Sequence, residues 1–373
     1  MSSLSDSSGF LDHFSEVEDP RIDRKKLYSM EEILLLTLLA VVSGCDGWAD
    51  IEIFGKTKLS LLREYLPYEN GTPSDDTLRR FFRVLDPVVF QKSFSTWVKA
   101  FTNQTQQVIA IDGKTHRRTH DGASNALHLV SAFAAESRMV LGQTAVNEKS
   151  NEITAIPTLI KWLDCEGAII TIDAMGCQTN IAKVIRNKKA DYILALKRNH
   201  KNMYEQVHDY FTDSSLRATC DSYETVNGGH GRIETRRCYS TSDIDWLYGK
   251  GDWKGIQSII MVESTREVEG KTSHEVRYYI SSLESNPERM LLSVRSHWAI
   301  ENSLHWVLDV GFGEDQSRIR KGNAPVNIGA MRHVALNLMQ LYKKPRQSIK
   351  QLRKLAGWDD QVLQDILAQA KSF

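Results

Sequence analysis

The sequence has few features of a secreted or membrane-bound protein. Its five cysteines are scattered, with no pair at CxxC spacing, so neither a disulfide framework nor a zinc finger is predicted. The N-terminal residues MSSLSDSSGF lack the basic and apolar regions of a secretory signal. The longest aliphatic run, from Ile33 to Val42, has about half the length of a membrane-spanning helix. We therefore expect a soluble, cytoplasmic protein with reduced thiols.

Nucleotide-cofactor fingerprints and an excess of charge of one sign are also absent. Neither GxGxxG nor a P-loop occurs, so no nucleotide cofactor is suggested. The 47 basic and 47 acidic residues cancel, but they are unevenly distributed. From Gln316 to Leu355 there is no Asp or Glu, whereas there are ten Lys or Arg residues. Such a segment is typical of a surface that contacts phosphates, and the alternative is a solvated basic helix face.

The N-terminal part of the chain, residues 1–104, has a helical pattern. The segment TPSDDTLRRFFRVL predicts a helix with Ser74 as its N-cap. On this helix Arg79, Arg80 and Arg83 lie on the side opposite the apolar residues. These arginines could contact DNA phosphates, or the helix could be an ordinary amphipathic surface helix.

From Gln107 the pattern changes to short strands. The segments VIAIDG, LHLVSAFAA and RMVLGQTAV are predicted strands, followed by helix EITAIPTLIKWLD, strand AIITIDA, helix TNIAKVIRNKK and strand DYILALK. This β-β-β-α-β-α-β order is that of ribonuclease H-like α/β folds, in which the first and fourth strands are neighbours. Residues 218–284 alternate apolar and polar positions and predict a β-rich insertion, after which a helix runs from about Pro287 to Val310.

Three acidic residues are the best candidates for a catalytic site. Asp112 and Asp173 each end an apolar strand, and Glu301 lies in the helix after the insertion. A lone Asp at such a position is commonly a helix cap or a turn residue. Two on neighbouring strands favour an oxygen-ligand site for Mg²⁺ or Mn²⁺, because their small or flexible neighbours Gly113, Ala174 and Gly176 would permit close approach of a ligand or a nucleic-acid backbone. That site is typical of two-metal phosphoryl transfer.

Ionisable side chains also surround Glu301. His297, Glu301, His305 and Asp309 are spaced four apart, so they share one helix face. The acids Asp309, Glu314 and Asp315 compete with Glu301 for the third position. Zinc bound by His297, Glu301 and His305 is an alternative, although three ligands spaced four apart on a straight helix do not easily surround one ion. We predict instead that the histidines orient the carboxylate or contact phosphate.

The segment GHGRIETRR, residues 229–237, places arginines around Glu234. If Ile233 faces inward on a strand, Arg232 and Glu234 share the opposite face. The segment could be a hairpin stabilised by cross-strand ion pairs or a patch that contacts DNA.

The blocks IDGKT, KSNEITAIP, TIDAMGCQ, DYILALK, GHGRIETRR, HWAIENSLHWVLD and SRIRKGNAP resemble, in this order, the DDE transposases of an insertion-sequence family that includes the H-repeat-associated proteins. The resemblance covers nearly the whole chain. It implies an N-terminal helical DNA-binding domain over 1–104 and a ribonuclease H-like catalytic domain over 105–373, with a basic C-terminal helical region from about 316. It also implies that Asp112, Asp173 and Glu301 form the catalytic triad and bind two Mg²⁺ or Mn²⁺ ions.

The sequence departs from these relatives in one respect. Around the third acid they carry Tyr-x2-Arg-x3-Glu-x6-Lys, where this chain has Val294, His297 and Leu308. The residues that we expect to contact DNA are Arg79, Arg80, Arg83, Lys114, His297, His305, Arg318, Arg320 and Lys321. The partners would be the element's ends and target DNA, bound by a homodimer or a larger assembly. The alternatives are a metal-dependent nuclease that cuts without joining and a DNA-binding protein whose catalysis has lapsed.

Overall fold

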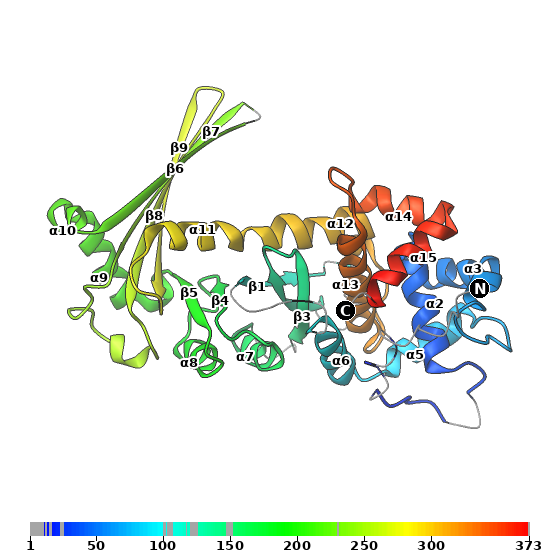
Figure 1. Cartoon of the computed structure of the whole chain (residues 1–373). Coiled ribbons are helices and arrows are strands. Elements are labelled where there is room, and N and C mark those ends of the chain that lie inside the picture. Colours follow the sequence, from blue (N-terminus) through cyan, green and yellow to red (C-terminus); the bar gives the residue numbers. More distant parts are fainter. Residues whose placement is uncertain are drawn as a thin grey trace.

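A nine-stranded mixed sheet runs through most of the molecule (Figure 1). The computed structural model describes residues 11, 13–14, 17–22, 26–99, 102, 107–116, 118–119, 126–146, 152–229 and 231–371. The strands are β1 (Val108–Thr115), β2 (His128–Ala134), β3 (Met139–Val146), β4 (Ile169–Ile172), β5 (Asp191–Leu196), β6 (Asp221–Gly229), β7 (Arg232–Thr241), β8 (Ser258–Val268) and β9 (Lys271–Ser281). Their order is β3-β2-β1-β4-β5-β9-β8-β7-β6. β1 and β4 are parallel neighbours, so the pairing predicted for these two strands is confirmed.

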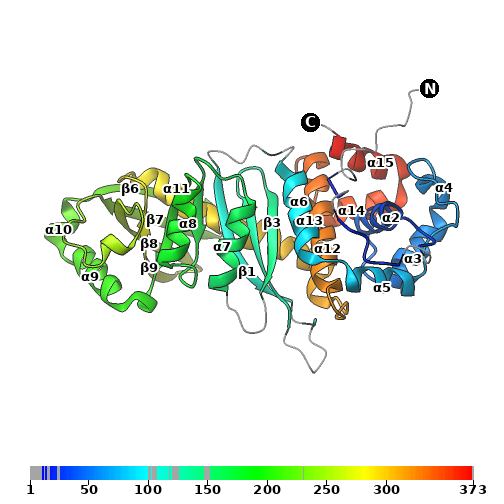
Figure 2. The ribbon, with the colours of Figure 1, turned by 90° about the horizontal axis from the view of Figure 1, so that it is seen from below.

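Helices cover both faces of the sheet. α7 (Glu152–Trp162) and α8 (Thr179–Asn187) lie on one face, and α11 (Pro287–His297) crosses the other (Figures 1 and 2). The buried apolar side chains of α11, including Met290, Leu291 and Val294, pack in a cluster with residues of the strands. Beyond α11 the chain continues through a π-helical turn (Glu301–His305) into α12 (Trp306–Phe312), which confirms the helix predicted to follow the insertion.

The predicted β-rich segment contains β6 to β9 and extends the same sheet. β5 pairs with β9 antiparallel, and α9 (Lys201–Thr212) and α10 (Ser214–Ala218) precede the added strands. The hairpin ends of β6–β9 project beyond the helices (Figure 1). Ile233 lies in this projecting part and is 51% exposed, so it does not face inward. The condition that Ile233 faces inward is therefore not met, because the hairpin end that carries it projects beyond the described helices (Figure 1).

The N-terminal and C-terminal helices pack together at the other end of the sheet (Figure 2). The helices are α2 (Met30–Val42), α3 (Trp48–Thr57), α4 (Leu59–Leu62), α5 (Asp75–Val84), α6 (Pro87–Lys99), α13 (Ala324–Tyr342), α14 (Ile349–Trp358) and α15 (Asp360–Ala368). α13 is buried along most of its length and contacts α2, α5, α6 and β3. The hydroxyl of Ser74 accepts a hydrogen bond from the amide of Thr77 at 3.3 Å, which confirms the predicted N-cap of α5. None of the described helices is both long enough and apolar enough to cross a membrane.

Candidate active site

Asp112 and Asp173 lie next to each other where the pairing of β1 with β4 ends. Ile111 pairs with Ile172, and each aspartate is the following residue. Equivalent positions on neighbouring parallel strands are about 4.8 Å apart, and their side chains leave the same face of the sheet. Both aspartates line one cavity of about 480 Å³, and Glu301 lies on its wall. Three carboxylates from distant parts of the chain therefore share one cavity.

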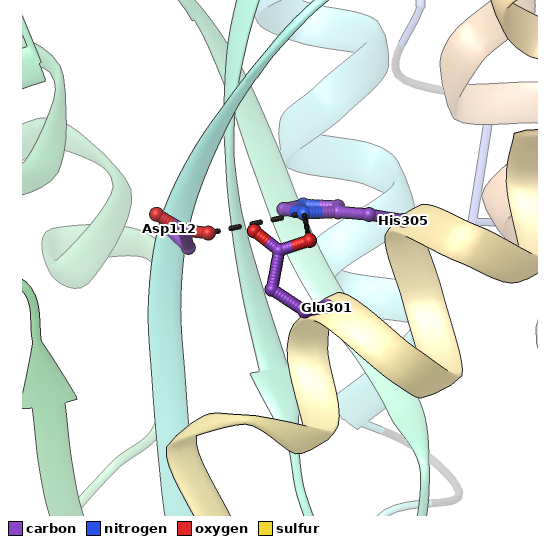
Figure 3. A group of neighbouring side chains, drawn as sticks. All are labelled: Asp112, Glu301 and His305. Atoms are coloured by element: carbon purple, nitrogen blue, oxygen red, sulfur yellow. Dashed lines mark ion pairs between the residues drawn. The ribbon is translucent and has the colours of Figure 1, made fainter. Parts of the chain in front are cut away.

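Glu301 reaches this cavity from the helix that crosses β1 and β4. A π-helical turn begins at Glu301, and the amide of Trp306 donates a hydrogen bond to the Glu301 carbonyl. Such turns are rare and are frequently found at functional sites. Nδ1 of His305 lies 3.4 Å from Oε2 of Glu301 and 3.8 Å from Oδ2 of Asp112 (Figure 3). One donor atom from each of these three residues lies within 4.8 Å of the others, so they could hold a metal ion together.

The electrostatics of Asp112 show that the cavity concentrates negative charge. Burial and then the charge of Glu301, with a smaller effect of Asp173, raise the pKa of Asp112 to about 8. Burial and neighbouring negative charge both penalise an ionised carboxylate. Burial lowers the pKa of His305 although Glu301 opposes this effect, which favours the neutral imidazole that a metal ion requires. Two carboxylates and a neutral imidazole are a donor set that fits a divalent cation.

Asp173 combines a turn-forming contact with a place on the cavity wall. Its Oδ1 accepts hydrogen bonds from the amides of Met175 at 3.0 Å and Gly176 at 3.3 Å. This is the turn role that the sequence left open as an alternative. Its Oδ2 accepts no hydrogen bond from the described residues, and the side chain faces the cavity. One oxygen thus fixes the carboxylate, and the other can bind a ligand.

The two glycines near the aspartates allow close packing of neighbouring side chains. A Cβ atom at Gly113 would collide with the side chains of Glu152 and His128, which form a 2.7 Å ion pair. A Cβ atom at Gly176 would collide with the side chain of Ile172. A larger residue at either position would therefore displace packed side chains, and the close approach of a ligand beside these glycines stays a prediction.

The predicted stripe of ionisable residues faces the sheet. Nδ1 of His297 lies 3.0 Å from the hydroxyl of Thr171, and burial lowers the pKa of His297. One turn later Glu301 and His305 face Asp112. His297 is not in the three-residue group that could hold a metal ion. The alternative zinc set with both histidines is therefore not formed among the described residues.

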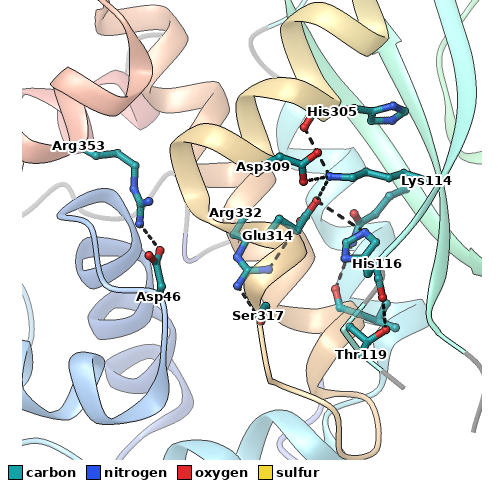
Figure 4. Close-up of polar contacts among 12 residues, drawn as sticks. Asp46, Lys114, His116, Thr119, His305, Asp309, Glu314, Ser317, Arg332 and Arg353 are labelled. Atoms are coloured by element: carbon teal, nitrogen blue, oxygen red, sulfur yellow. Dashed lines mark hydrogen bonds and ion pairs between the residues drawn. The ribbon is translucent and has the colours of Figure 1, made fainter. Parts of the chain in front are cut away.

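A buried ionic cluster lies beside the cavity (Figure 4). Nζ of Lys114 is 3.1 Å from Oε2 of Glu314 and also pairs with Asp309. Glu314 is 2% exposed, and His116 Nε2 and Arg332 Nη1 each lie 3.7 Å from one of its carboxyl oxygens. Burial alone would raise the pKa of Glu314, but His116, Lys114 and Arg332 outweigh it and hold that pKa far below its ordinary range.

This cluster distinguishes Glu301 from two of its competitors. Asp309 and Glu314 already pair with Lys114, whereas Glu301 lies in the cavity beside Asp112. Nothing in the sequence marks the cluster, because Lys114 and Glu314 are separated by 200 positions. The DNA contact expected of Lys114 stays a prediction, and its ammonium group is held here by two carboxylates.

Helix α5 and the loop before α13 carry predicted DNA contacts and lie against each other. The amide of Asn323 donates a 3.0 Å hydrogen bond to the carbonyl of Arg83. A Cβ atom at Gly322 would lie 2.7 Å from the side chain of Arg83. Arg318 and Lys321 are exposed on the same loop, and the guanidinium of Arg320 donates to the carbonyl of Arg118 at 2.7 Å. The fold thus places the C-terminal end of α5 against the loop that carries residues 318–321.

Some basic residues of the C-terminal segment serve the fold instead. Arg332 and Arg353 are 3% and 5% exposed. Arg353 donates to the carbonyl of Val41 and pairs with Asp46 at 3.0 Å, which ties α14 to the end of α2 (Figure 4). These two arginines cannot belong to an exposed basic surface.

The GHGRIETRR segment opens onto a second cavity, of about 620 Å³, which adjoins the first. Five arginines and an exposed tryptophan line it: Arg232, Arg236, Arg266, Arg277, Arg295 and Trp298. Glu234 contacts Arg236 and lies 3.7 Å from Arg232 and Arg266, and β7 and β8 pair Glu234 with Arg266. A cross-strand ion pair, one of the two interpretations of this segment, is therefore present, and the contact with DNA stays a prediction. Arg277 and Trp298 line both cavities, so the arginine-rich cavity lies next to the acidic one.

Comparison with known proteins gives two matches to family models. Residues 103–338 match the model described as "Transposase DDE domain", and residues 11–98 match the model described as "DDE_Tnp_1-associated".

Similar proteins extend over nearly the whole chain. "Putative transposase YncI" of Escherichia coli O157:H7 is 40% identical over 97% of this chain and 95% of its own length. "H repeat-associated putative transposase YhhI" of Escherichia coli strain K12 is 38% identical over 96% of this chain and 97% of its own length. A shorter match, "Inactive transposase YbfQ" of strain K12, is 46% identical over 19% of this chain and 83% of its own length.

Proposed function

The chain belongs to the DDE transposase family, and we propose that it cleaves DNA at the ends of an insertion sequence and joins those ends to target DNA. Asp112, Asp173 and Glu301 are the catalytic carboxylates of this proposal. The observation that carries it is their convergence on one cavity from β1, the end of β4 and the π-helical turn. Such crowding of carboxylates is unfavourable without a cation, as the raised pKa of Asp112 indicates.

The proposal includes two divalent cations, Mg²⁺ or Mn²⁺, held by these three side chains. Carboxylate oxygens are suitable ligands for both ions. Bound there, the ions would supply the Lewis acidity that phosphodiester cleavage and transfer require. The protein's own contribution is to hold the ligands in place. The pairing of β1 with β4 sets the positions of Asp112 and Asp173, and the turn at Met175 and Gly176 fixes one Asp173 oxygen.

We propose that β1–β5 with α7 and α8 form a ribonuclease H-like core. The strand order β3-β2-β1-β4-β5 supports this assignment. Residues 1–104 would be a helical DNA-binding domain and residues 105–373 the catalytic domain. The packing of α13 against α2 and α5 means that these proposed domains share an extensive interface.

The proposed DNA contacts lie on both sides of the acidic cavity. Arg79 and Arg80 pair with Asp75 and Asp76 at 2.7 and 2.6 Å in exposed positions. Exposed pairs of this kind contribute little to stability, about 0–1 kcal/mol, so phosphates can replace the aspartates. This surface would be extended by Arg83, Arg318, Arg320 and Lys321. The proposed DNA contacts nearer the cavity are His297, His305 and Lys114. The arginine-rich cavity would contact the DNA strand on the opposite side of the acidic cavity.

A strand-joining assay tests this function against its alternatives. The purified protein is incubated with a labelled duplex of its own element end, a plasmid target and Mg²⁺ or Mn²⁺. Label joined to the plasmid is the expected result. Cleavage without joining would favour a nuclease. Binding without cleavage would favour a DNA-binding protein whose catalysis has lapsed, and one relative, YbfQ, is named an inactive transposase. Light scattering of the DNA complex would test the proposed homodimer or larger assembly.

A further inference from the structure

His305 occupies a position that a purely carboxylate metal site does not explain. The residue is 5% exposed, and its Nδ1 atom points between Asp112 and Glu301 (Figure 3). We propose that His305 is a direct nitrogen ligand of the divalent cation held by Asp112 and Glu301. This inference rests on the proposed function only in assuming that a cation binds at these two carboxylates.

The distances suit a shared ion. Metal–ligand bonds of about 2.0–2.3 Å place neighbouring donor atoms of an octahedral site roughly 3 Å apart. The Nδ1 atom of His305 lies 3.4 Å from the Glu301 oxygen and 3.8 Å from the Asp112 oxygen. A shift of less than about 1 Å brings these atoms to bonding positions. The side chain of Glu301 is 51% exposed, so it can make that shift without displacing packed neighbours.

The backbone brings both helical ligands to the same turn. Glu301 begins the π-helical turn and His305 ends it. Lys114 Nζ lies 3.5 Å from the carbonyl of His305, and the ammonium also pairs with Asp309. These contacts join β1, which carries Asp112, to the turn that carries His305. Lys114 therefore fixes the strand and the turn relative to each other beside the proposed ion.

The remaining polar atom of the ring is consistent with this role. Nε2 of His305 is buried and has no hydrogen-bond partner among the described residues. A buried polar atom without a partner is unfavourable and is tolerated mainly where the group has another task. Coordination through Nδ1 would leave the proton on Nε2.

A nitrogen ligand changes which ions the site prefers. Mg²⁺ favours oxygen ligands, whereas Mn²⁺, Co²⁺ and Zn²⁺ accept imidazole. The site should therefore bind Mn²⁺ more tightly than Mg²⁺, and His305→Gln should remove most of that preference. We expect the substitution to weaken Mn²⁺ binding by at least about tenfold, because even residues outside the ligand set cause losses of that size.

Pulsed electron paramagnetic resonance of Mn²⁺ bound to the full-length protein tests the inference. A nitrogen bonded to Mn²⁺ modulates the electron spin echo, and we expect this ¹⁴N modulation in the wild-type protein. It should disappear in His305→Gln and persist in His297→Gln, the matched control on the same helix face. Labelling the wild-type protein and His297→Gln with [¹⁵N]histidine should replace the ¹⁴N pattern in both. If His305→Gln folds poorly, this result still shows that a histidine other than His297 supplies the nitrogen.

The outcomes separate this inference from the proposed function. Stoichiometric Mn²⁺ without nitrogen modulation in the wild-type protein, or modulation that persists in His305→Gln, would overturn the role of His305. If the wild-type protein nevertheless cleaves and joins DNA, the proposed function stands. Nitrogen modulation in a protein that neither cleaves nor joins DNA would leave the ligand assignment intact and refute the proposed function.

Discussion

At the level of single residues, the protonation of Asp112 links cation binding to pH. The pKa of this carboxyl is about 8 in the folded chain, compared with about 3.9 in an unfolded chain. Between these values the folded protein holds a proton that the unfolded chain has released. The contribution of Asp112 to stability therefore falls as pH rises through this window. A cation must displace that proton, so its apparent affinity should rise up to about pH 8 and then level off.

We predict that Mg²⁺ raises the melting temperature more at pH 8 than at pH 6, at equal concentration and ionic strength. Ligands that bind only the folded state stabilise it more as their apparent affinity rises, with a logarithmic dependence. Thermal unfolding with and without Mg²⁺ measures the effect. Asp112→Asn should lose both the increase and its dependence on pH. Equal increases at the two pH values would contradict the assignment of Asp112 as the protonated ligand.

Lys114 and Glu314 make a second residue-level prediction. Lys114→Met leaves the buried Glu314 carboxylate with less compensating charge, which should destabilise the fold by about 3 kcal/mol. Urea unfolding measures this loss. Lys114→Met combined with Glu314→Gln should recover much of it, because the uncompensated charge is then gone. If the single substitution costs less than about 1 kcal/mol, the cluster is not the stabilising contact that its burial indicates.

A candidate residue could be identified from the sequence only where its neighbours along the chain mark it. The sequence singles out three acids. Asp112 and Asp173 each end an apolar strand segment, and Glu301 lies in a segment with clear helical periodicity. Glu314 could be identified only as a competitor, because its partners come from β1 and α13 and meet it only in the folded chain.

At the level of elements, periodicity predicted the strands and helices better than their connections. The order of β1–β5 and the helix carrying Glu301 follow from apolar patterns in the chain. The π-helical turn could not be predicted from these patterns. An i, i+4 spacing of polar residues on the helix does not reveal that one turn is wider than the others. The pairing of β5 with β9 also could not be predicted, since it joins segments on either side of the insertion.

The arginine-rich cavity allows a prediction for β7 and β8. Substituting Arg232 and Arg266 with Ala should weaken binding to DNA and flatten the log–log salt dependence by about one unit for each lost phosphate contact. Titrations at several salt concentrations measure the slope. Arg289→Ala, an exposed arginine outside this cavity, is the control. An unchanged slope in the double variant would leave these arginines with only their ion pairs to Glu234.

At the level of the whole molecule, the packing of the first and last helices brings two basic segments together. Changing Arg318, Arg320 and Lys321 to Ala should weaken binding to any DNA and flatten the salt slope. Changing Arg79, Arg80 and Arg83 should reduce binding to the element's own ends more than binding to random DNA, if α5 reads sequence. Binding titrations with both kinds of DNA separate these effects.

The control for these triple variants is Lys183→Ala with Lys189→Ala. Lys183 lies in α8, which is on the face of the sheet opposite α11 (Figure 2), and Lys189 follows the end of this helix. If the salt slope is unchanged after Arg318, Arg320 and Lys321 are changed to Ala, the loop does not contact phosphates and is a solvated surface. Equal losses for specific and random DNA in the α5 variant would exclude sequence reading by this helix.

Catalysis by the three converging carboxylates is tested most directly by cleavage of a labelled element end in Mg²⁺. Asp112→Asn, Asp173→Asn and Glu301→Gln each remove a negative charge and nearly preserve volume. Each should abolish cleavage and leave DNA binding largely intact. Glu166→Gln, an exposed acid paired with Lys189, should cleave as the wild type does. Wild-type cleavage by any one of the three variants would show that its residue is not a catalytic carboxylate.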